Sequence, residues 1–189
     1  MKFNIENYLE SHRRLSERLD RSELQNALSM VEMAFNKGQK IFTLGNGGSA
    51  STASHYITDW NKMINLATKK KFRGICLCDN IGLITAYAND ISYDHVFAGQ
   101  LEAMADDGDL VIAVSGSGNS PNVLKALETA KKMGCVSLGV LGYDGGKAKS
   151  LCDHSVVVPS YDMQLCEDVH LQFGHLVMKH LCGDDIVCD

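Results

Sequence analysis

Proline, long apolar runs and an excess of basic charge are all missing from this chain of 189 residues. Only two prolines occur, and no low-complexity linker or internal repeat divides the sequence, so we expect a single domain over residues 1–189. No segment approaches the roughly 20 apolar residues of a membrane span, which excludes a membrane partner. The formal net charge of −5 gives no electrostatic footprint for nucleic acid, so no nucleic-acid partner is expected either.

Signals for export and for disulfide bonding are also lacking. The first residues, Met1 to Glu6, have no apolar core of the kind found in signal peptides, and we therefore expect a cytoplasmic protein. Seven cysteines are present, an odd number at irregular spacing, and Cys76 and Cys78 are separated by one residue rather than two. We expect reduced and mostly buried thiols, and no zinc site made of four cysteines.

The apolar residues, 45% of the chain, follow two alternating patterns. Apolar positions at three- and four-residue spacing predict helices, and short apolar runs ending in Gly, Ser or Asp predict strands. Five strands are expected, over residues 40–44, 74–77, 109–114, 136–140 and 155–158. Helices are expected over about 49–64, 81–87, 96–104, 121–133, near 147, and over 163–181. This alternation predicts an α/β fold, a three-layer sandwich around a five-stranded parallel sheet of the flavodoxin type.

The first 37 residues are expected to form two helices in front of an α/β core at residues 38–189. The first helix carries an apolar stripe of Ile5, Leu9, Leu15 and Leu19. The second is predicted to begin at Ser22, because Gln25 follows three residues later as in a capping box, and to end at Gly38. Apolar stripes of this kind need a partner surface, so we interpret residues 1–37 as oligomerisation helices.

A loop rich in serine and glycine, residues 115–120, follows the third predicted strand. Its three hydroxyls, its two glycines and the backbone N–H groups at the start of the next helix all favour an anion. The loop contains no Lys or Arg, and neutral donors are sufficient to hold a small phosphate monoester. A helix cap without a ligand is the alternative, and phosphate binding is the preferred interpretation.

A second glycine-rich loop, residues 45–50, follows the first predicted strand. Gly45, Gly47 and Ala50 fit the dinucleotide fingerprint Gly-x-Gly-x-x-Gly/Ala. In that motif a carboxylate follows about 20 residues later, at the end of the next strand. Here the next strand ends later than that, at Asp79, and Asp59 comes too early. We therefore expect no nucleotide cofactor.

Taken in order, these motifs resemble the sugar isomerase (SIS) domain family, and within it the phosphoheptose isomerases, over nearly the whole chain. The residues that carry the resemblance are Gly45-Asn46-Gly47-Gly48-Ser49-Ala50, His55, Asp59, Asn89-Asp90, Ser115-Gly116-Ser117-Gly118-Asn119-Ser120, Asp144-Gly145-Gly146, Glu167-Asp168-Val169-His170 and His175. The resemblance implies an aldose–ketose isomerase that interconverts sedoheptulose 7-phosphate and D-glycero-D-manno-heptose 7-phosphate through an enediol, for the heptose of surface glycans. It also implies a homotetramer whose active sites are shared between subunits.

The same resemblance implies roles for individual residues. Asp59 stands where the family has a Glu thought to act as base, and His175 stands where it has the partner acid/base His. In some members the positions of His55, Asp59, Glu167 and His175 bind zinc, which implies one ion per subunit. The implied substrate-binding positions are Asn46, Gly47, Gly48, Ser49, Asn89, Asp90, Ser115, Gly116, Ser117, Ser120 and Glu167.

Three of these positions depart from the family pattern. Asp59 is one methylene shorter than Glu, Glu167 stands where many members have Gln, and Gly116 stands where Thr is common. The extra carboxylate at position 167 adds a negative charge that favours a metal ion. The sequence leaves open whether these residues hold zinc or act as free acid and base, and zinc is the preferred interpretation.

Helical geometry supports part of this assignment. His55 and Asp59 are four residues apart and share a helix face. Glu167 and His175 diverge by about 80°, a broad shared face, whereas His170 lies about 140° from His175 and is assigned a structural or subunit-contact role.

Two other functions remain as alternatives, an isomerase of another phosphosugar and a non-catalytic phosphosugar-binding regulator. A regulator would need the serine-rich loop but not the four candidate zinc ligands. Their presence therefore favours the enzyme.

Overall fold

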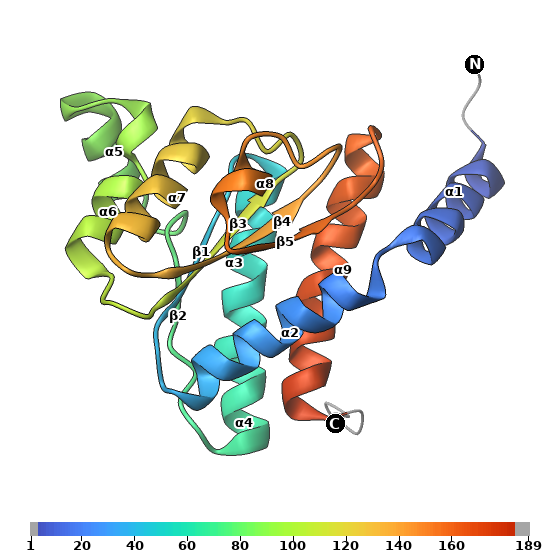
Figure 1. Ribbon diagram of the computed structural model, residues 1–189, viewed down its shortest axis with the longest axis horizontal. Coiled ribbons are helices and arrows are strands. Elements are labelled where there is room, and N and C mark those ends of the chain that lie inside the picture. Colours follow the sequence, from blue (N-terminus) through green and yellow to red (C-terminus); the bar gives the residue numbers. More distant parts are fainter. Residues whose placement is uncertain (1–3, 184–189) are drawn as a thin grey trace.

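The computed structural model describes residues 4–183 and shows a parallel sheet between two layers of helices (Figure 1). The five strands are β1 (Ile41–Leu44), β2 (Gly74–Cys76), β3 (Leu110–Ser115), β4 (Val136–Leu141) and β5 (His154–Val157). They pair in the order β2-β1-β3-β4-β5, and every pair is parallel. The predicted three-layer α/β sandwich with flavodoxin-type strand order is confirmed.

Side chains of each strand alternate between the two helical layers. Ile41 packs in a cluster with α2 (Arg21–Asn36), α3 (Gly48–Asp59) and α9 (Met163–Cys182). Phe42, the next residue, packs in the opposite cluster. The helices that contribute to this second cluster are α5 (Ile81–Asp90), α6 (Ala98–Met104), α7 (Pro121–Lys132) and α8 (Ala148–Leu151). Because both faces of the sheet are covered, most strand side chains are apolar, and the buried exceptions are Thr43, Ser115, Ser137 and Ser155.

The two N-terminal helices lie on the α9 side of the sheet, and α1 (Ile5–Arg18) extends outward beyond α9 (Figure 1). Half of its predicted apolar stripe is used within the chain, since Leu15 and Leu19 are buried. Ile5 and Leu9, in contrast, are 64% and 58% exposed. The outer part of the stripe is therefore left without a partner in this chain.

The start of α2 differs from the prediction. The Asp20 carboxylate accepts hydrogen bonds from the backbone N–H groups of Ser22 (2.8 Å) and Glu23 (3.2 Å), so the helix begins at Arg21. An ionised carboxylate is an effective cap for the free N–H groups of a first turn. The predicted capping box of Ser22 and Gln25 is therefore wrong. The helix ends as predicted, with Gly38 following it at φ +69°.

The helix after the first glycine-rich loop is longer than predicted. Instead of ending near Ile64, α3 continues through a π-helical turn, Trp60–Ile64, into α4 (Asn65–Thr68). Trp60 holds this extension, because its ring is fully buried and its indole N–H donates to the Gly174 carbonyl of α9 at 2.9 Å. Such turns often occur beside functional sites, and Asp59 directly precedes this one.

Other boundaries shift by a few residues. The helix expected over 96–104 begins only at Ala98, after a 3₁₀ turn at Tyr93–His95. Helix α5 extends to Asp90, three residues beyond the prediction. Within residues 4–183, none of the helices is long and apolar enough to cross a bilayer.

Candidate active site

Both glycine-rich loops lie at the carboxyl edge of the sheet, after the adjacent strands β1 and β3. The chain leaves β1 toward β2 on one side and leaves β3 toward β4 on the other, so the two loops diverge from one point. In open parallel sheets this switch point forms the crevice in which ligands bind. The topology therefore brings the two predicted ligand loops together.

A pair of amides joins the two loops directly. Asn46 and Asn122 each donate to the other's side-chain oxygen at 2.9 Å, and Asn122 is almost completely buried. The hydroxyl of Tyr93 adds a third hydrogen bond to Asn46, at 3.1 Å. Asn46 is thus held in one orientation before any ligand binds. Beside it, Gly47 has φ +56°, a conformation that favours glycine, and it precedes the first turn of α3.

The serine-rich loop keeps its hydroxyl hydrogens available. The Ser115 hydroxyl oxygen accepts from the Gly118 N–H at 3.0 Å, and that of Ser117 accepts from the Asn119 N–H at 3.2 Å. Each hydroxyl therefore still has its hydrogen to donate. Ser120 is the N-cap residue of α7, but its side chain makes no capping bond. Three hydroxyls and a helix N-terminus thus form an arrangement suited to a phosphate.

The predicted Asp144-Gly145-Gly146 segment packs against this loop. Asn119 bridges the two, because its amide donates to the Ser117 carbonyl at 2.9 Å and its oxygen accepts from the Lys147 N–H at 3.1 Å. A cavity of about 360 Å³ opens beside the bridge, and its charged lining residues are Lys125, Lys147, Asp94 and Glu128. The loop itself has no cation, but two lysines therefore lie close by.

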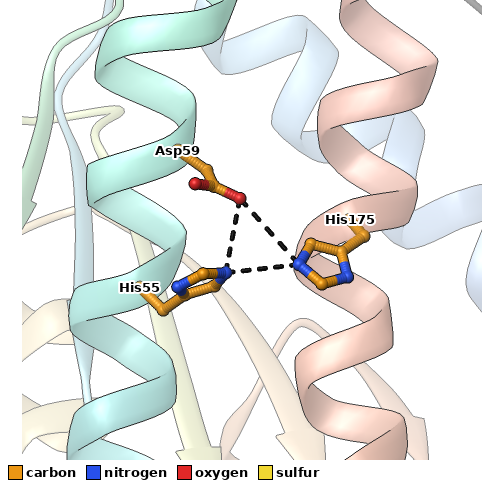
Figure 2. A group of neighbouring side chains, drawn as sticks. All are labelled: His55, Asp59 and His175. Atoms are coloured by element: carbon orange, nitrogen blue, oxygen red, sulfur yellow. Dashed lines mark hydrogen bonds and ion pairs between the residues drawn. The ribbon is translucent and has the colours of Figure 1, made fainter. Parts of the chain in front are cut away.

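His55, Asp59 and His175 come together between α3 and α9, as Figure 2 shows. The Nε2 atoms of the two histidines are 3.2 Å apart. The Oδ2 atom of Asp59 lies 3.3 Å from Nε2 of His55 and 3.9 Å from Nε2 of His175. The side chains of His55 and His175 are 41% and 48% exposed, so the cluster faces outward from this chain. We call these three residues the His–Asp–His triad.

The triad fits a zinc ion. Ligand atoms about 2.0 to 2.1 Å from a tetrahedral zinc lie about 3.3 Å from one another. Two of the three separations in the triad, 3.2 and 3.3 Å, match that spacing, and the third, 3.9 Å, exceeds it slightly. Two imidazoles and a carboxylate are also a common donor set for catalytic zinc, which keeps a fourth position for water or substrate.

Glu167, the fourth predicted zinc ligand, is not part of the triad. It lies two helical turns before His175, about 12 Å along the axis of α9. Its carboxylate sits over the first turn of α3, where a side chain at Gly48 would overlap it. The positive end of a helix stabilises an anion there. The glycine at position 48 therefore makes room for Glu167 beside the loop that contains Asn46.

Asn89 and Asp90 lie away from the other predicted site residues. They end α5, on the opposite side of the sheet from α9 (Figure 1). Asn89 donates to Asp90 at 2.8 Å, and both are exposed. Within residues 4–183, no hydrogen bond or ion pair joins them to the two loops or to the triad. Tyr93, three residues after Asp90, instead donates to Asn46 of the first loop.

His170 is buried, as its angular separation from His175 predicts. It is fully inaccessible, and its ring nitrogens make no hydrogen bond within the described part of the chain. Burial disfavours the imidazolium and lowers the pKa of His170 to about 4. His170 is thus a neutral core residue at neutral pH. Its carbonyl accepts a hydrogen bond from the buried Tyr56 hydroxyl, which links α9 to α3.

Gly116 packs against the start of α9. A side chain at position 116 would overlap the sulfur of Met163, the first residue of α9. The methionine therefore occupies the space that a threonine would need.

Sequence reasoning missed three supporting residues, Asn122, Tyr93 and Met163. Only Asn122 has a local signal, a polar residue directly after the proline that opens α7. The contacts of Tyr93 and Met163 depend on segments distant in the chain.

Comparison with known proteins identifies the family. A sequence model of the SIS domain matches residues 7–142. The phosphoheptose isomerase of Pelobacter propionicus is 42% identical over 151 residues, which cover 80% of this chain and 79% of that protein. That of Campylobacter concisus is 38% identical over 181 residues, 95% of each protein.

A solved structure supports the same grouping. The phosphoheptose isomerase of Neisseria gonorrhoeae superimposes with a TM-score of 0.86 and 25% sequence identity, over 94% of this chain and 96% of that one. The chain belongs to the SIS domain family and, within it, to the phosphoheptose isomerases.

Proposed function

We propose that this chain interconverts sedoheptulose 7-phosphate and D-glycero-D-manno-heptose 7-phosphate, for the heptose of surface glycans. The observation that carries the proposal is the His–Asp–His triad on α3 and α9, in a chain whose serine-rich loop is suited to a phosphate. Isomerisation moves a proton between C1 and C2 through an enediol, which requires a base near those carbons and a donor near the carbonyl oxygen. Membership of the phosphoheptose isomerases supports the same reaction.

The loops bind and orient the substrate in this proposal. Ser115, Ser117 and Ser120 donate to the phosphate, and Gly116 is assigned to the same anion through its backbone. Asn46, Gly47, Gly48 and Ser49 line the sugar, with Glu167 above the first turn of α3. The Asn46 amide is held by Asn122 and Tyr93, so it contacts the sugar without reorganising.

The triad carries the proton transfer. Asp59 is assigned as the base that removes the proton from carbon, and His175 as the group that exchanges a proton with the carbonyl oxygen. Their nearest atoms are 3.9 Å apart, so adjacent atoms of one sugar can contact both. His55 contacts both residues and holds their relative positions.

We also propose one zinc ion per subunit, held by His55, Asp59 and His175, with Glu167 as the family-derived fourth ligand after a side-chain rearrangement. When bound, zinc would polarise the sugar carbonyl as a Lewis acid. A carboxylate that ligates zinc is a weaker base than a free one. The metal dependence of the rate therefore decides which role Asp59 has.

The test is turnover of sedoheptulose 7-phosphate by the purified protein, followed by detection of the aldose, before and after chelation and with zinc added back. Turnover that chelation removes and zinc restores supports the zinc enzyme. Turnover that is unchanged by chelation supports the proposed isomerase without zinc, with Asp59 and His175 acting as free base and acid. Absence of turnover under all three conditions contradicts the proposed substrate, and a panel of hexose and pentose phosphates then tests the alternative isomerase.

We further propose a single SIS domain in which residues 1–37 mediate assembly and residues 38–189 form the α/β core of a homotetramer. The exposed Ile5 and Leu9 support a partner for α1. Asn89 and Asp90 lie across the sheet from α9 and make no described hydrogen bond or ion pair with the triad, which supports active sites shared between subunits, in which these residues serve a neighbouring copy. The six cysteines of the described part of the chain are free, which suits the proposed cytoplasmic location, whereas Cys188 lies outside the described residues.

A further inference from the structure

The backbone determines which way the paired amides of Asn46 and Asn122 face. The Val123 backbone N–H donates to the Asn122 side chain at 3.0 Å. Because a backbone N–H can only donate, the Asn122 atom that it meets must be the amide oxygen. The nitrogen of Asn122 is therefore the atom that donates to Asn46, at 2.9 Å, and the Asn46 atom that accepts must be its oxygen. One backbone donor thus sets the orientation of both amides.

The side-chain oxygen of Asn46 is fully used within the chain. It accepts from Asn122 at 2.9 Å and from the Tyr93 hydroxyl at 3.1 Å, and an amide oxygen has two lone pairs. The nitrogen of Asn46 carries two hydrogens, and one of them is donated to Asn122. Within residues 4–183, the other hydrogen meets no acceptor. Asn46 therefore offers a ligand one N–H donor and no acceptor.

The surroundings of Asn46 leave room for a ligand. Asn46 is half-buried, and the next two residues, Gly47 and Gly48, are exposed. A side chain at Gly47 would meet no other atom within 4 Å, so the space beside Asn46 is open. On the other loop, the hydroxyl hydrogens of Ser115 and Ser117 are available to donate. Both loops thus present donors, which suits a ligand rich in oxygen acceptors.

We propose that Tyr93 and Asn122 are positioning residues, which hold Asn46 so that it presents only an N–H donor to an oxygen of the sugar chain. That oxygen belongs to a carbonyl or a hydroxyl group, since either accepts a hydrogen bond, whereas a protonated amine in its place does not. The inference rests on the proposed isomerase, because it describes how the substrate of that reaction is held. Tyr93 and Asn122 act through Asn46 and need no contact of their own with the sugar.

The two positioning residues contribute in different ways. Without the Asn122 amide, nothing distinguishes the oxygen of Asn46 from its nitrogen on that side, so the Asn46 amide can rotate by 180° and present its oxygen to the sugar. Without the Tyr93 hydroxyl, one lone pair of the Asn46 oxygen loses its donor, and Asn122 alone holds the amide. Loss of one neutral hydrogen bond corresponds to about a two- to tenfold change in an equilibrium or rate constant.

A double-mutant cycle tests the positioning role by kcat/KM for sedoheptulose 7-phosphate. Tyr93→Phe should lower kcat/KM about two- to tenfold in the wild type but change it less than about twofold in Asn46→Ala, because Asn46 is the described partner of the phenol. Tyr161→Phe, at another exposed tyrosine, is the matched control and should have no effect in either background. Equal losses from Tyr93→Phe in both backgrounds overturn the proposal.

Asn122→Ala enters the same cycle and should likewise have no further effect in Asn46→Ala. Asn122 is almost completely buried, so thermal unfolding first shows whether this variant folds. If it does not, Tyr93→Phe decides the question, because Tyr93 is 55% exposed and its replacement leaves the packing intact.

Two further measurements test the polarity of Asn46. Asn46→Asp presents an oxygen in place of the free N–H, so its kcat/KM should be no higher than that of Asn46→Ala, and a value within about threefold of the wild type overturns the proposal. Neutron diffraction from deuterium-exchanged crystals of the unliganded protein should place a deuteron on the Tyr93 oxygen, directed at Asn46. A deuteron on Asn46 directed at Tyr93 overturns the assignment. If sedoheptulose 7-phosphate is not turned over, the proposed function fails, and the deuteron positions still decide the polarity.

Discussion

The length of the side chain at position 59 affects the geometry of the triad. Asp59 reaches His55 at 3.3 Å but His175 only at 3.9 Å, and that longer separation is the one that exceeds the spacing expected around zinc. A glutamate would extend the carboxylate by one methylene. With the shorter aspartate, the triad still forms, but the separation between Asp59 and His175 is the longest of the three. Glu167 adds a second carboxylate to the α3–α9 helix pair.

Replacing His175 by alanine should stop catalysis and leave the fold intact. The side chain is 48% exposed, so its removal is expected to change the free energy of unfolding by less than about 0.5 kcal/mol. Loss of an acid/base group should lower turnover by a factor of about 10² to 10⁴. Turnover assays and thermal unfolding of His175→Ala check this, with His12→Ala as the control histidine. A fully active His175→Ala protein would exclude both roles proposed for the residue.

Gly116 and Met163 should behave as a coupled pair. Gly116→Thr overlaps the sulfur of Met163, the far end of a flexible, half-buried side chain, so we expect a loss of only about 1 kcal/mol of stability. In the double variant Gly116→Thr/Met163→Ala the new side chain has room, so most of that loss should be recovered. Urea denaturation of both single variants and the double variant measures the coupling. Purely additive costs would show that the two positions do not compete for space.

At the scale of secondary-structure elements, the sequence predicted all five strands and the order of the helices, but not their exact ends. The short apolar runs that form strands and the glycines that end helices are local features, so they can be recognised in the sequence. The continuation of α3 depends on Trp60 meeting α9, and the start of α2 on which of several polar residues caps it. Helical spacing placed His55 and Asp59 on one face, whereas the family resemblance alone supplied His175, on a different helix, as their partner. The eight residues from Glu167 to His175 correspond to about 12 Å along α9, and the angular argument alone did not include this rise. The contact of Glu167 with the first turn of α3 depends on how the two helices pack, which the sequence does not show.

The contact between α1 and α9 should weaken at high pH. The Tyr8 hydroxyl donates to the Asp168 carboxylate at 2.5 Å, and this bond raises the pKa of Tyr8 to about 12. The folded protein therefore favours the neutral phenol. The stabilisation is fully present below pH 10, the ordinary tyrosine pKa, and is lost as the pH rises through about 12.

Denaturation at pH 9 and pH 11.5 measures this effect. The free energy of unfolding should fall more between the two values in the wild type than in Tyr8→Phe. Tyr161→Phe, at a residue that is 76% exposed, is the control and should follow the wild type. An equal fall in Tyr8→Phe would mean that the α1–α9 contact does not depend on the phenol.

At the scale of the whole molecule, the chain presents an outward-facing triad, an exposed end of α1 and a helix, α5, with no buried residue. Surfaces of this kind are usual where subunits meet. Size-exclusion chromatography with light scattering should give about four times the chain mass of 20.7 kDa. The double variant Ile5→Asp/Leu9→Asp should give a smaller species with reduced turnover, whereas Val136→Lys, on a different edge, should do neither. A fully active monomer would exclude shared active sites.

The amide pair of Asn46 and Asn122 also affects the separation between the serine-rich loop and the triad. It ties the glycine-rich loop before α3 to α7, the helix that follows the serine-rich loop. Because α3 carries His55 and Asp59, the protein holds the serine hydroxyls and the triad at a set separation. A sugar with the wrong number of carbons between phosphate and carbonyl can engage only one end of that separation. Such a sugar then lacks the rate advantage that comes from being held in the reactive geometry at both ends. On the proposed assignment of the serine-rich loop and the triad to one substrate, the protein therefore selects the length of the carbon chain before the configuration of any hydroxyl.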